Sequence, residues 1–386
     1  MLNLVGGIVF LGKIRYNADK KAHGAHIIDK GIETMAVTAK EIAEKLGVSP
    51  AAVSLAMNGK PGVSVATREK ILAEAVRVGY AKQAESAPIS AQNIRYVIFL
   101  DGGATVKETS FYSIVLQGIE SKAKVYGYNV LISYFDANGD WDEQITSICK
   151  DVAGLIVLAT EIEDRHIQKA IEHGLGKQPI PVVLVDNATS MVDVDCVVTD
   201  NLGGAYHAVM YLMNKNHPDV GYLRSKSRID SFDERESGVR KARRKSGISA
   251  HTPLQCINVG ISSEEAFYDM GKWLHDGGKP LSAFFADNDI IAAACIRAFK
   301  SRGYRIPEDV SIVGFDDMPV CTMVDPPLTT IRVMKSLMGM TSMDMLYQRI
   351  QDGTHALSDE RVGVLRTTIS THLVERESAI SYHSEV

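Results

Sequence analysis

VTAKEIAEKLGVSPAAVSLAMNGKPGVSVATREKILAEAVRVGYAKQ, residues 37–83, carries the strongest structural signals in this chain. Thr38 and Glu41 form a T-x-x-E capping box, and the apolar positions that follow predict a first helix that ends at Gly47. Ser49 has the side chain that caps a second helix, and a proline at the first position of that helix suits its missing N–H. Two short helices around one turn predict a helix-turn-helix.

The second helix of such a motif points its N-terminal part into the major groove of DNA. A third helix is expected from about Thr67 to Val78, followed by Gly79. Ala51 and Leu55 would then occupy the base-reading face, which is apolar and suited to thymine methyl groups. The full set of predicted DNA-contacting residues in this region is Ser49, Pro50, Ala51, Ser54, Leu55, Asn58, Ser64 and Thr67. Ser49, Asn58, Ser64 and Thr67 are assigned to phosphates.

Charge is distributed unevenly along the chain. The net charge of the 386 residues is −5. Residues 35–83 nevertheless contain seven Lys or Arg against four Glu, a surplus of three positive charges. A small basic segment on an acidic body suits phosphate contacts and salt-dependent affinity for DNA.

Several motifs in this segment resemble the headpiece of LacI-type transcriptional regulators. They are V-T-x-x-E-I-A, G-V-S-x-x-x-V-S, N-G at 58–59, V-S-x-x-T-R-E-K-I at 63–71 and G-Y at 79–80. The resemblance implies a homodimer that binds a pseudo-palindromic double-stranded operator, one half-site for each headpiece. The alternative for a short helical segment is a packing or protein-docking module.

Residues 1–34 are expected to be an N-terminal extension, with Met35 as the true start, because LacI-type headpieces begin within a few residues of the first capping box. The apolar beginning, MLNLVGGIVFLG, does not resemble a secretory signal, since its basic residues come after the apolar run. Five cysteines lie far apart without a C-x-x-C motif, so neither a disulfide framework nor a zinc site is predicted. We therefore expect a cytoplasmic protein with no membrane segment, cofactor or metal.

Residues 84–93, AESAPISAQN, have the composition of a linker after the headpiece domain at 35–83. In LacI-type proteins the matching segment folds on DNA into a helix whose leucine enters the minor groove. Ile89 stands at that position here, so it is a further predicted DNA contact. Pro88 precedes it, and proline costs about 3 kcal/mol in a helix interior. An unfolded tether is therefore the equal alternative.

From residue 94 to about 380, apolar runs alternate with amphipathic stretches, which predicts parallel sheets covered by helices. The runs fall into two series of four, so we expect two doubly wound α/β lobes. The expected strands are 94–100, 128–135, 153–159 and 181–186, then 220–224, 253–259, 281–286 and 310–315. This pattern resembles the periplasmic sugar-binding-protein fold that LacI-type regulators use as an effector and dimerisation domain. The family implies a small-molecule effector between the lobes, with a sugar as the default.

The resemblance also assigns candidate ligand-binding residues in this two-lobed region. Phe111 begins S-F-Y-S-I-V-L-Q-G-I-E and could stack on a sugar or base, or belong to the core. Arg235 matches an R-x-x-G motif, where a guanidinium binds ligand hydroxyls or a carboxylate; the alternative is an exposed arginine on a helix. Asp289 in A-D-N-D-I-I-A falls at the carboxyl end of a strand, where it could bind ligand or cap a helix. Asp186 and Ser231 are weaker candidates.

Other classes of protein find little support in the sequence. It contains none of the G-x-G-x-x-G, G-x-x-x-x-G-K-[ST], G-x-S-x-G and H-E-x-x-H motifs, so catalysis is not expected. An exported sugar carrier conflicts with the headpiece, and an interaction protein with a vestigial headpiece remains an alternative. The segments 313–317 and 325–332 are interpreted as fold and crossover signatures. The sequence thus predicts an effector-controlled transcriptional repressor.

Overall fold

The computed structural model divides the chain into two compact units, Met1–Ala84 and Glu85–Val386. It describes residues 38–57, 63–64, 67–68, 70–71, 74–75, 78, 92–103, 106, 110–178, 180–189, 191–354 and 363–383. The expected extension at 1–34 and the expected hinge, including Pro88 and Ile89, lie outside these residues, as does Asn58.

The first unit contains the predicted helices α1, Ala39–Leu46, and α2, Pro50–Met57. The capping box is present, because the Glu41 amide donates to Thr38 Oγ1 and the Thr38 amide donates to Glu41 Oε2. Gly47 ends α1 with a φ of 64°, a left-handed conformation that glycine adopts without strain. Among the described residues of this unit, a buried apolar cluster consists of Ile42, Ala43, Val53, Ala56, Ile71 and Ala75. A helix-turn-helix is therefore confirmed.

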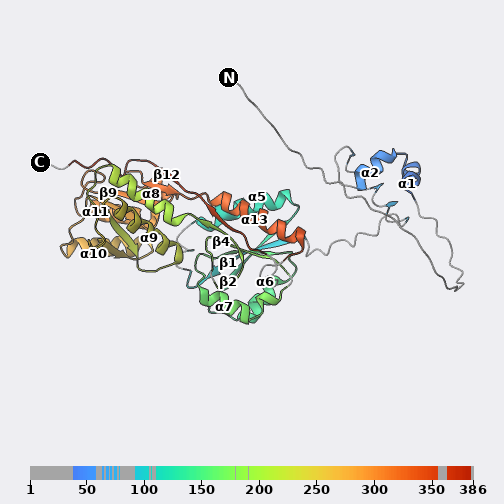
Figure 1. The fold of residues 1–386 in the computed structure, drawn as a ribbon, viewed down its shortest axis with the longest axis horizontal. Coiled ribbons are helices and arrows are strands. Elements are labelled where there is room, and N and C mark those ends of the chain that lie inside the picture. The colour runs from blue at the N-terminus through green and yellow to red at the C-terminus, as the bar shows by residue number, and fades with distance from the viewer. Residues whose placement is uncertain are drawn as a thin grey trace, which may run out of the picture. The chain divides into compact units, whose positions relative to one another are not determined.

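The second unit consists of two lobes, each built on a six-stranded sheet (Figure 1). The first sheet has the order β11-β5-β4-β3-β1-β2, and all its strand pairs are parallel. Its strands are β1 Asn93–Leu100, β2 Asn129–Asp136, β3 Leu155–Leu158, β4 Val182–Val185, β5 Asp195–Thr199 and β11 Arg366–Ile369. Its helices are α5 Phe111–Val125, α6 Trp141–Cys149, α7 Asp164–Glu172, the short 3-10 helix η2 Leu175–Lys177, and α13 Lys335–Asp352.

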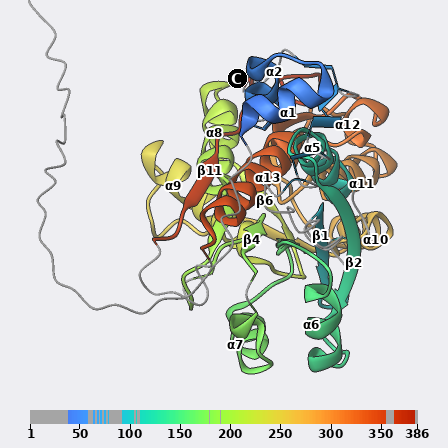
Figure 2. The same cartoon turned by 90° about the vertical axis from the view of Figure 1, so that its right-hand side faces the viewer.

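The side chains of β1 point alternately to the two faces of the first sheet, and helices cover both faces. Tyr96 and Ile98 join the core under α5 and α13, whereas Val97 and Phe99 join a separate core with Trp141 of α6. Figures 1 and 2 accordingly show α5 with α13 on one side of the sheet and α6 with α7 on the other. The buried strands thus carry apolar residues at successive positions, as the sequence predicted.

The second sheet has the order β12-β10-β9-β8-β6-β7 and is parallel except for the antiparallel edge strand β12. Its strands are β6 Gly221–Ser225, β7 Cys256–Val259, β8 Ala283–Ala286, β9 Ser311–Asp316, β10 Thr329–Arg332 and β12 His372–Val374. Its helices are α8 Asn201–Asn214, α9 Asp230–Lys245, α10 Ser263–His275, α11 Asp289–Ser301 and α12 Val320–Met323. The orders of the two sheets match strand for strand, so β1, β3 and β4 correspond to β6, β8 and β9.

All eight predicted strands are present, with ends within three residues of the expected positions. Four short strands, β5, β10, β11 and β12, were not predicted from the sequence. These strands flank the three places where the chain crosses from one lobe to the other. The crossings connect β5 to α8, β10 to α13, and β11 to β12. Residues 197–199 belong to the first sheet as part of β5, and the second lobe begins with α8. Among the described residues, no helix is long and apolar enough to cross a membrane.

Close backbone contact joins α5 to α13, the helix that follows the second crossover. A Cβ atom on Gly118 would lie 2.1 Å from the backbone oxygen of Ser336, and one on Gly339 would lie 2.1 Å from the backbone oxygen of Val115. Both distances are far below a van der Waals contact, and backbone atoms cannot rotate away. Glycine at these positions therefore sets the separation of the two helices, and with it the position of α5.

Candidate functional site

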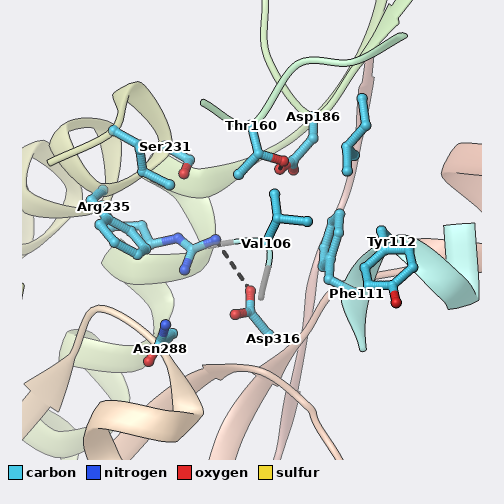
Figure 3. Close-up of a pocket in the computed structure, with 12 residues that line it drawn as sticks. Val106, Phe111, Tyr112, Thr160, Asp186, Ser231, Arg235, Asn288 and Asp316 are labelled. Atoms are coloured by element: carbon cyan, nitrogen blue, oxygen red, sulfur yellow. Dashed lines mark hydrogen bonds and ion pairs between the residues drawn. The ribbon is translucent and has the colours of Figure 1, made fainter. Parts of the chain in front are cut away.

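A pocket opens between the two lobes of the second unit, at the carboxyl ends of the strands (Figure 3). The first lobe contributes Val106, Phe111, Tyr112, Leu158, Thr160 and Asp186, and the second contributes Ile229, Ser231, Phe232, Arg235, Asn288 and Asp316. Apolar walls with a few convergent polar groups are typical of small-molecule sites. The crevice outside the carboxyl ends of parallel strands is where open α/β sheets bind ligands.

Two carboxylates occupy corresponding places in the two lobes. Asp186 follows β4, and Asp316 is the last residue of the corresponding strand β9. Both have positive φ angles, 77° for Asp186 and 106° for Asp316, which non-glycine residues rarely adopt. Such strain is found at functional sites. Figure 3 shows both side chains at the pocket, one on each side of the Arg235 guanidinium.

Arg235 is the central cation of the pocket and is only 5% exposed. Its Nε donates to Asn201 Oδ1 at 3.0 Å, its Nη1 to the backbone oxygen of Asp287 at 2.5 Å, and its Nη2 to Asp316 Oδ1 at 3.2 Å. Its guanidinium carbon also lies 3.8 Å from the ring centroid of Phe315. A guanidinium has five N–H groups, so these three bonds leave two for a ligand. The arginine is held rigidly and can still donate into the pocket.

Helix packing explains why Arg235 points into this site. Gly238, one turn later on α9, lies against α8, and a Cβ there would be 2.4 Å from the backbone oxygen of Leu202. The glycine of the R-x-x-G motif therefore lets α9 approach α8 closely, and this contact directs Arg235 inward. The predicted motif combines a packing residue with a pocket residue.

An aromatic wall on the first-lobe side comes from the start of α5. Phe111 is the first residue of that helix, and Figure 3 shows its ring beside that of Tyr112. The Lys335 ammonium lies 5.9 Å from the Phe111 ring centroid and donates to the backbone oxygen of Asp316. An aromatic face of this kind can stack on a sugar ring or a base.

Burial changes the ionisation of both pocket carboxylates. Loss of hydration raises the pKa of Asp186 to about 7, although the hydrogen bond from Thr160, 2.7 Å long, opposes the shift. Burial also raises the pKa of Asp316, and the neighbouring Arg235 opposes that shift. Ligand groups that donate hydrogen bonds or carry positive charge would stabilise the ionised forms.

Four of the five predicted ligand residues line the pocket, namely Phe111, Asp186, Ser231 and Arg235. Asp289 does not line it. Its carboxylate is fully buried and accepts hydrogen bonds from the Met318 amide at 2.8 Å and from Thr330 Oγ1 at 2.5 Å. Gly314 leaves room for it, since a Cβ there would lie 2.3 Å from Asp289 Oδ1.

The competing role for Asp289, capping a helix, is also wrong. Asn288 caps α11, because its Oδ1 accepts the Ile291 amide at 2.9 Å. A different aspartate, Asp200, caps α8, because its Oδ1 accepts the Gly203 amide at 2.8 Å. Asp289 is fully buried in the interior of the second lobe, where loss of hydration raises its pKa to about 7.

Sequence reasoning missed several lining residues, of which Asp316 is the most important. The sequence pattern assigns Asp316 to a fold signature. Asp316 nevertheless ends the apolar strand β9, much as Asp186 directly follows the apolar strand β4. The rule that polar residues at the carboxyl ends of strands meet at one edge would have found Thr160, Asn288 and Asp316 together. No comparable signal marks Phe232, whose ring reaches the pocket from α9.

In the first unit, the structure describes most of the predicted DNA-contacting residues. Pro50, Ala51 and Ser54 are exposed, and Leu55 is half-exposed. The hydroxyl of Ser49 accepts the Ala52 amide at 3.1 Å, so it caps α2. Ser64 Oγ accepts the Thr67 amide at 3.2 Å and lies 2.8 Å from Thr67 Oγ1. The N-terminal part of α2 therefore presents an accessible, mostly apolar face.

In the part of the chain that the structure describes, no group of three or more His, Cys, Asp or Glu side chains could hold a metal ion. The five cysteines are all free.

Comparisons with known proteins agree on both units. Residues 38–83 match the family described as bacterial regulatory proteins, lacI family, and residues 209–379 match a periplasmic binding protein-like domain. The chain is 27% identical to the transcriptional repressor PurR of Photobacterium profundum, over 82% of this chain and 93% of that protein. It is 29% identical to the repressor CytR of Escherichia coli K12, over 85% and 93%, and 28% identical to catabolite control protein A of Priestia megaterium, over 77% and 87%.

Solved structures with the same fold include a regulator CelR–cellobiose complex, with a TM-score of 0.63 and 24% identity over 89% of this chain and 99% of that one. The Lac repressor dimer bound to operator and the anti-inducer ONPF gives 0.63 and 23%, over 89% and 99%. A LacI family regulator of Enterococcus faecium with bound ribose gives 0.62 and 22%, over 75% and 100%. At these identities the likeness establishes the fold.

Proposed function

Because the chain belongs to the lacI family of bacterial regulatory proteins, we propose that it is a sequence-specific transcriptional repressor whose operator affinity is controlled by a small molecule. The proposal gives DNA binding to a headpiece at 35–83 and effector binding to a domain at 94–380, joined by a linker at 84–93. It also places the protein in the cytoplasm, where the bacterial chromosome lies.

The observation that carries the proposal is a pocket whose polar groups come from both lobes. Asp186 belongs to the first lobe, whereas Arg235 and Asp316 belong to the second. A ligand that bonds to all three is more strongly bound when the lobes are close than when they are apart. Ligand binding therefore shifts the equilibrium toward the arrangement in which the lobes are close. Such a shift is the basis of allosteric control of operator affinity.

A neutral, hydroxyl-rich effector such as a sugar suits this pocket. Vicinal hydroxyls can donate to carboxylates and accept from the two remaining N–H groups of Arg235, and a sugar face can pack on Phe111. The ribose and cellobiose in the similar structures agree with this class.

We further propose that the protein acts as a homodimer on a pseudo-palindromic operator. The similar Lac repressor structure is a dimer bound to operator. A protein with twofold symmetry reads two half-sites related by the same axis, so each headpiece would bind one of them.

A thermal-shift screen of sugars and nucleosides, followed by DNA-binding measurements, tests the proposal. A ligand at about 100 times its Kd should add about 2.7 kcal/mol to the free energy of unfolding. An operator can be selected in vitro from random DNA, and the same ligand must change its mobility shift. If the protein selects no sequence with or without a ligand, the repressor function is wrong.

The affinity for a sugar effector should rise with pH across the pKa of Asp186. Since that pKa is about 7, the carboxylate is mostly protonated at pH 6 and mostly ionised at pH 8. Ligand hydroxyls donate to the ionised form, so calorimetry should find binding about tenfold tighter at pH 8.

Asp186→Asn is the matched variant for this pH dependence, because it keeps the size of the side chain and cannot ionise. Its affinity should be low at both pH values, with the tenfold difference removed. The ligand-free variant should also be more stable than the parent at pH 8. A buried carboxyl whose folded pKa is raised destabilises the fold increasingly as pH rises from about 4 to about 7. An unchanged pH profile would exclude Asp186 as a ligand contact.

Leu55→Ala should weaken operator binding while sparing the fold of the headpiece. Leu55 is half-exposed and lies outside the buried cluster of six residues, so its loss should not unfold the unit. The lost apolar contact should cost roughly 1–2 kcal/mol on the operator, or about 5–30-fold in Kd. Binding to random DNA and the salt dependence should stay the same, because phosphate contacts are kept. Equal losses on operator and random DNA would remove Leu55 from base reading.

A further inference from the structure

Glu161 binds the backbone of the loop that follows β1 and carries Val106 into the pocket. Its Oε2 accepts the amides of Asp101 at 2.8 Å and Gly103 at 3.0 Å, and its Oε1 accepts the amide of Val106 at 3.4 Å. The side chain is only 8% exposed. Bonds from N–H groups to a carboxylate are about twice as strong as neutral ones. One buried side chain thus fixes three points of this loop.

The loop is shaped to fit this carboxylate. Gly102 and Gly103 have φ angles of 83° and 70°, which let the N–H groups of Asp101 and Gly103 turn toward the same carboxylate oxygen. Arg165 of α7 also forms a salt bridge with this loop, since its Nη2 lies 2.9 Å from Asp101 Oδ2. The loop after β1 is therefore held from the segment after β3.

A second carboxylate plays the same part in the other lobe. Asp287 follows β8, which corresponds to β3, and it is fully buried. It accepts the amide of Ser225, at the end of β6, at 2.7 Å and Arg228 Nη1 at 2.6 Å. The segment that it holds leads to Ile229, another apolar wall of the pocket. The two lobes thus use matching anchors for their first loops.

We propose that Glu161 is a positioning residue for the effector site, with Asp287 as its counterpart. Glu161 does not line the pocket but holds Val106, and so one apolar wall of the pocket, in place. Because Val106 is already held in place before the ligand binds, binding does not have to order this part of the pocket. The conformational entropy cost of binding is therefore lower, and the affinity is higher. The inference rests on the proposed effector function.

Hydrogen exchange tests the positioning without any ligand. In Glu161→Ala the amides of Asp101, Gly103 and Val106 should exchange about tenfold faster or more, because bonds to a charged group are lost. Glu161→Gln, which keeps one acceptor oxygen, should show a smaller change. Glu163→Gln is the control, since it removes a neighbouring, more exposed charge that pairs with Arg165. Unchanged exchange in Glu161→Ala would overturn the proposal.

Calorimetry with ribose and cellobiose supplies the second test, well below the melting temperature of each variant. If either sugar binds the parent, its Kd should rise about tenfold or more in Glu161→Ala, and less in Glu161→Gln. A residue with only a structural role would lower the melting temperature and leave Kd unchanged, and that result would also overturn the proposal. If neither sugar binds the parent, the choice of these sugars fails, and hydrogen exchange alone decides the role of Glu161.

Discussion

Arg235→Ala should abolish the response to the effector and leave the headpiece able to bind DNA. The guanidinium supplies the pocket's N–H donors, so we expect Kd to rise at least about 100-fold, the equivalent of about 3 kcal/mol. Asp316 would lose its 3.2 Å partner inside the protein. Breaking a buried pair from one side costs about 3–5 kcal/mol of stability.

A matched control lies on the same helix. Arg240 of α9 forms an exposed pair with Glu236, and its side chain is 50% exposed. Arg240→Ala should therefore change stability by less than about 1 kcal/mol and leave effector binding intact. Arg235→Lys separates charge from geometry, because an ammonium keeps the positive charge but cannot bond to Asn201, Asp287 and Asp316 together.

Calorimetry, thermal denaturation and mobility shifts distinguish the outcomes for Arg235. The expected pattern for Arg235→Ala is lost effector binding, a lower melting temperature of the second unit and DNA binding that no longer responds to the effector. If the variant binds the effector like the parent protein, the assignment of this pocket is wrong.

Gly118→Ala should strongly destabilise the first lobe. The new Cβ would meet the backbone oxygen of Ser336 at 2.1 Å, so α5 and α13 must move apart. Overpacking usually costs about 1–3 kcal/mol, and a clash of two backbones belongs at or above the upper end. Since α5 begins with Phe111, the same shift should also weaken effector binding.

Gly271→Ala is the control for a helical glycine without such a contact. Gly271 lies in α10, and a Cβ there would have nothing within 4 Å. Alanine is favoured over glycine inside a helix by about 0.5–1 kcal/mol, so this variant should be slightly more stable. Urea denaturation of both variants measures the difference. Equal stability of the two variants would show that the α5–α13 contact is looser than described.

Local patterns were sufficient to predict most of the secondary structure. The capping box of Thr38 and Glu41 predicted α1, and apolar runs predicted eight strands. The strands β10, β11 and β12 escaped because they are short, mix polar with apolar residues and have partners in distant parts of the chain. A short run has no periodicity of its own, so only the completed sheet identifies it.

The candidate pocket shows the same limit of local information. The R-x-x-G motif pointed to Arg235, which lines the pocket, because Gly238 belongs to the same helix and the same pattern. Motifs could not separate Asp289 from Asp316, since both are acidic residues at the carboxyl edge of the second sheet. Asp316 turns into the pocket through its positive φ, whereas Asp289 is held inside by Met318 and Thr330.

The sequence by itself determined the helix-turn-helix, the two α/β lobes and the family of this protein, because caps, hydrophobic periodicity and motifs act over a few residues. Only the tertiary structure decided which carboxylates line the pocket and which, like Glu161 and Asp287, bind the backbone of the loops beside it. The physical reason is that these roles depend on backbone direction and on partners far away in sequence. Glu161 and Val106, for example, meet only after β1 and β3 have paired.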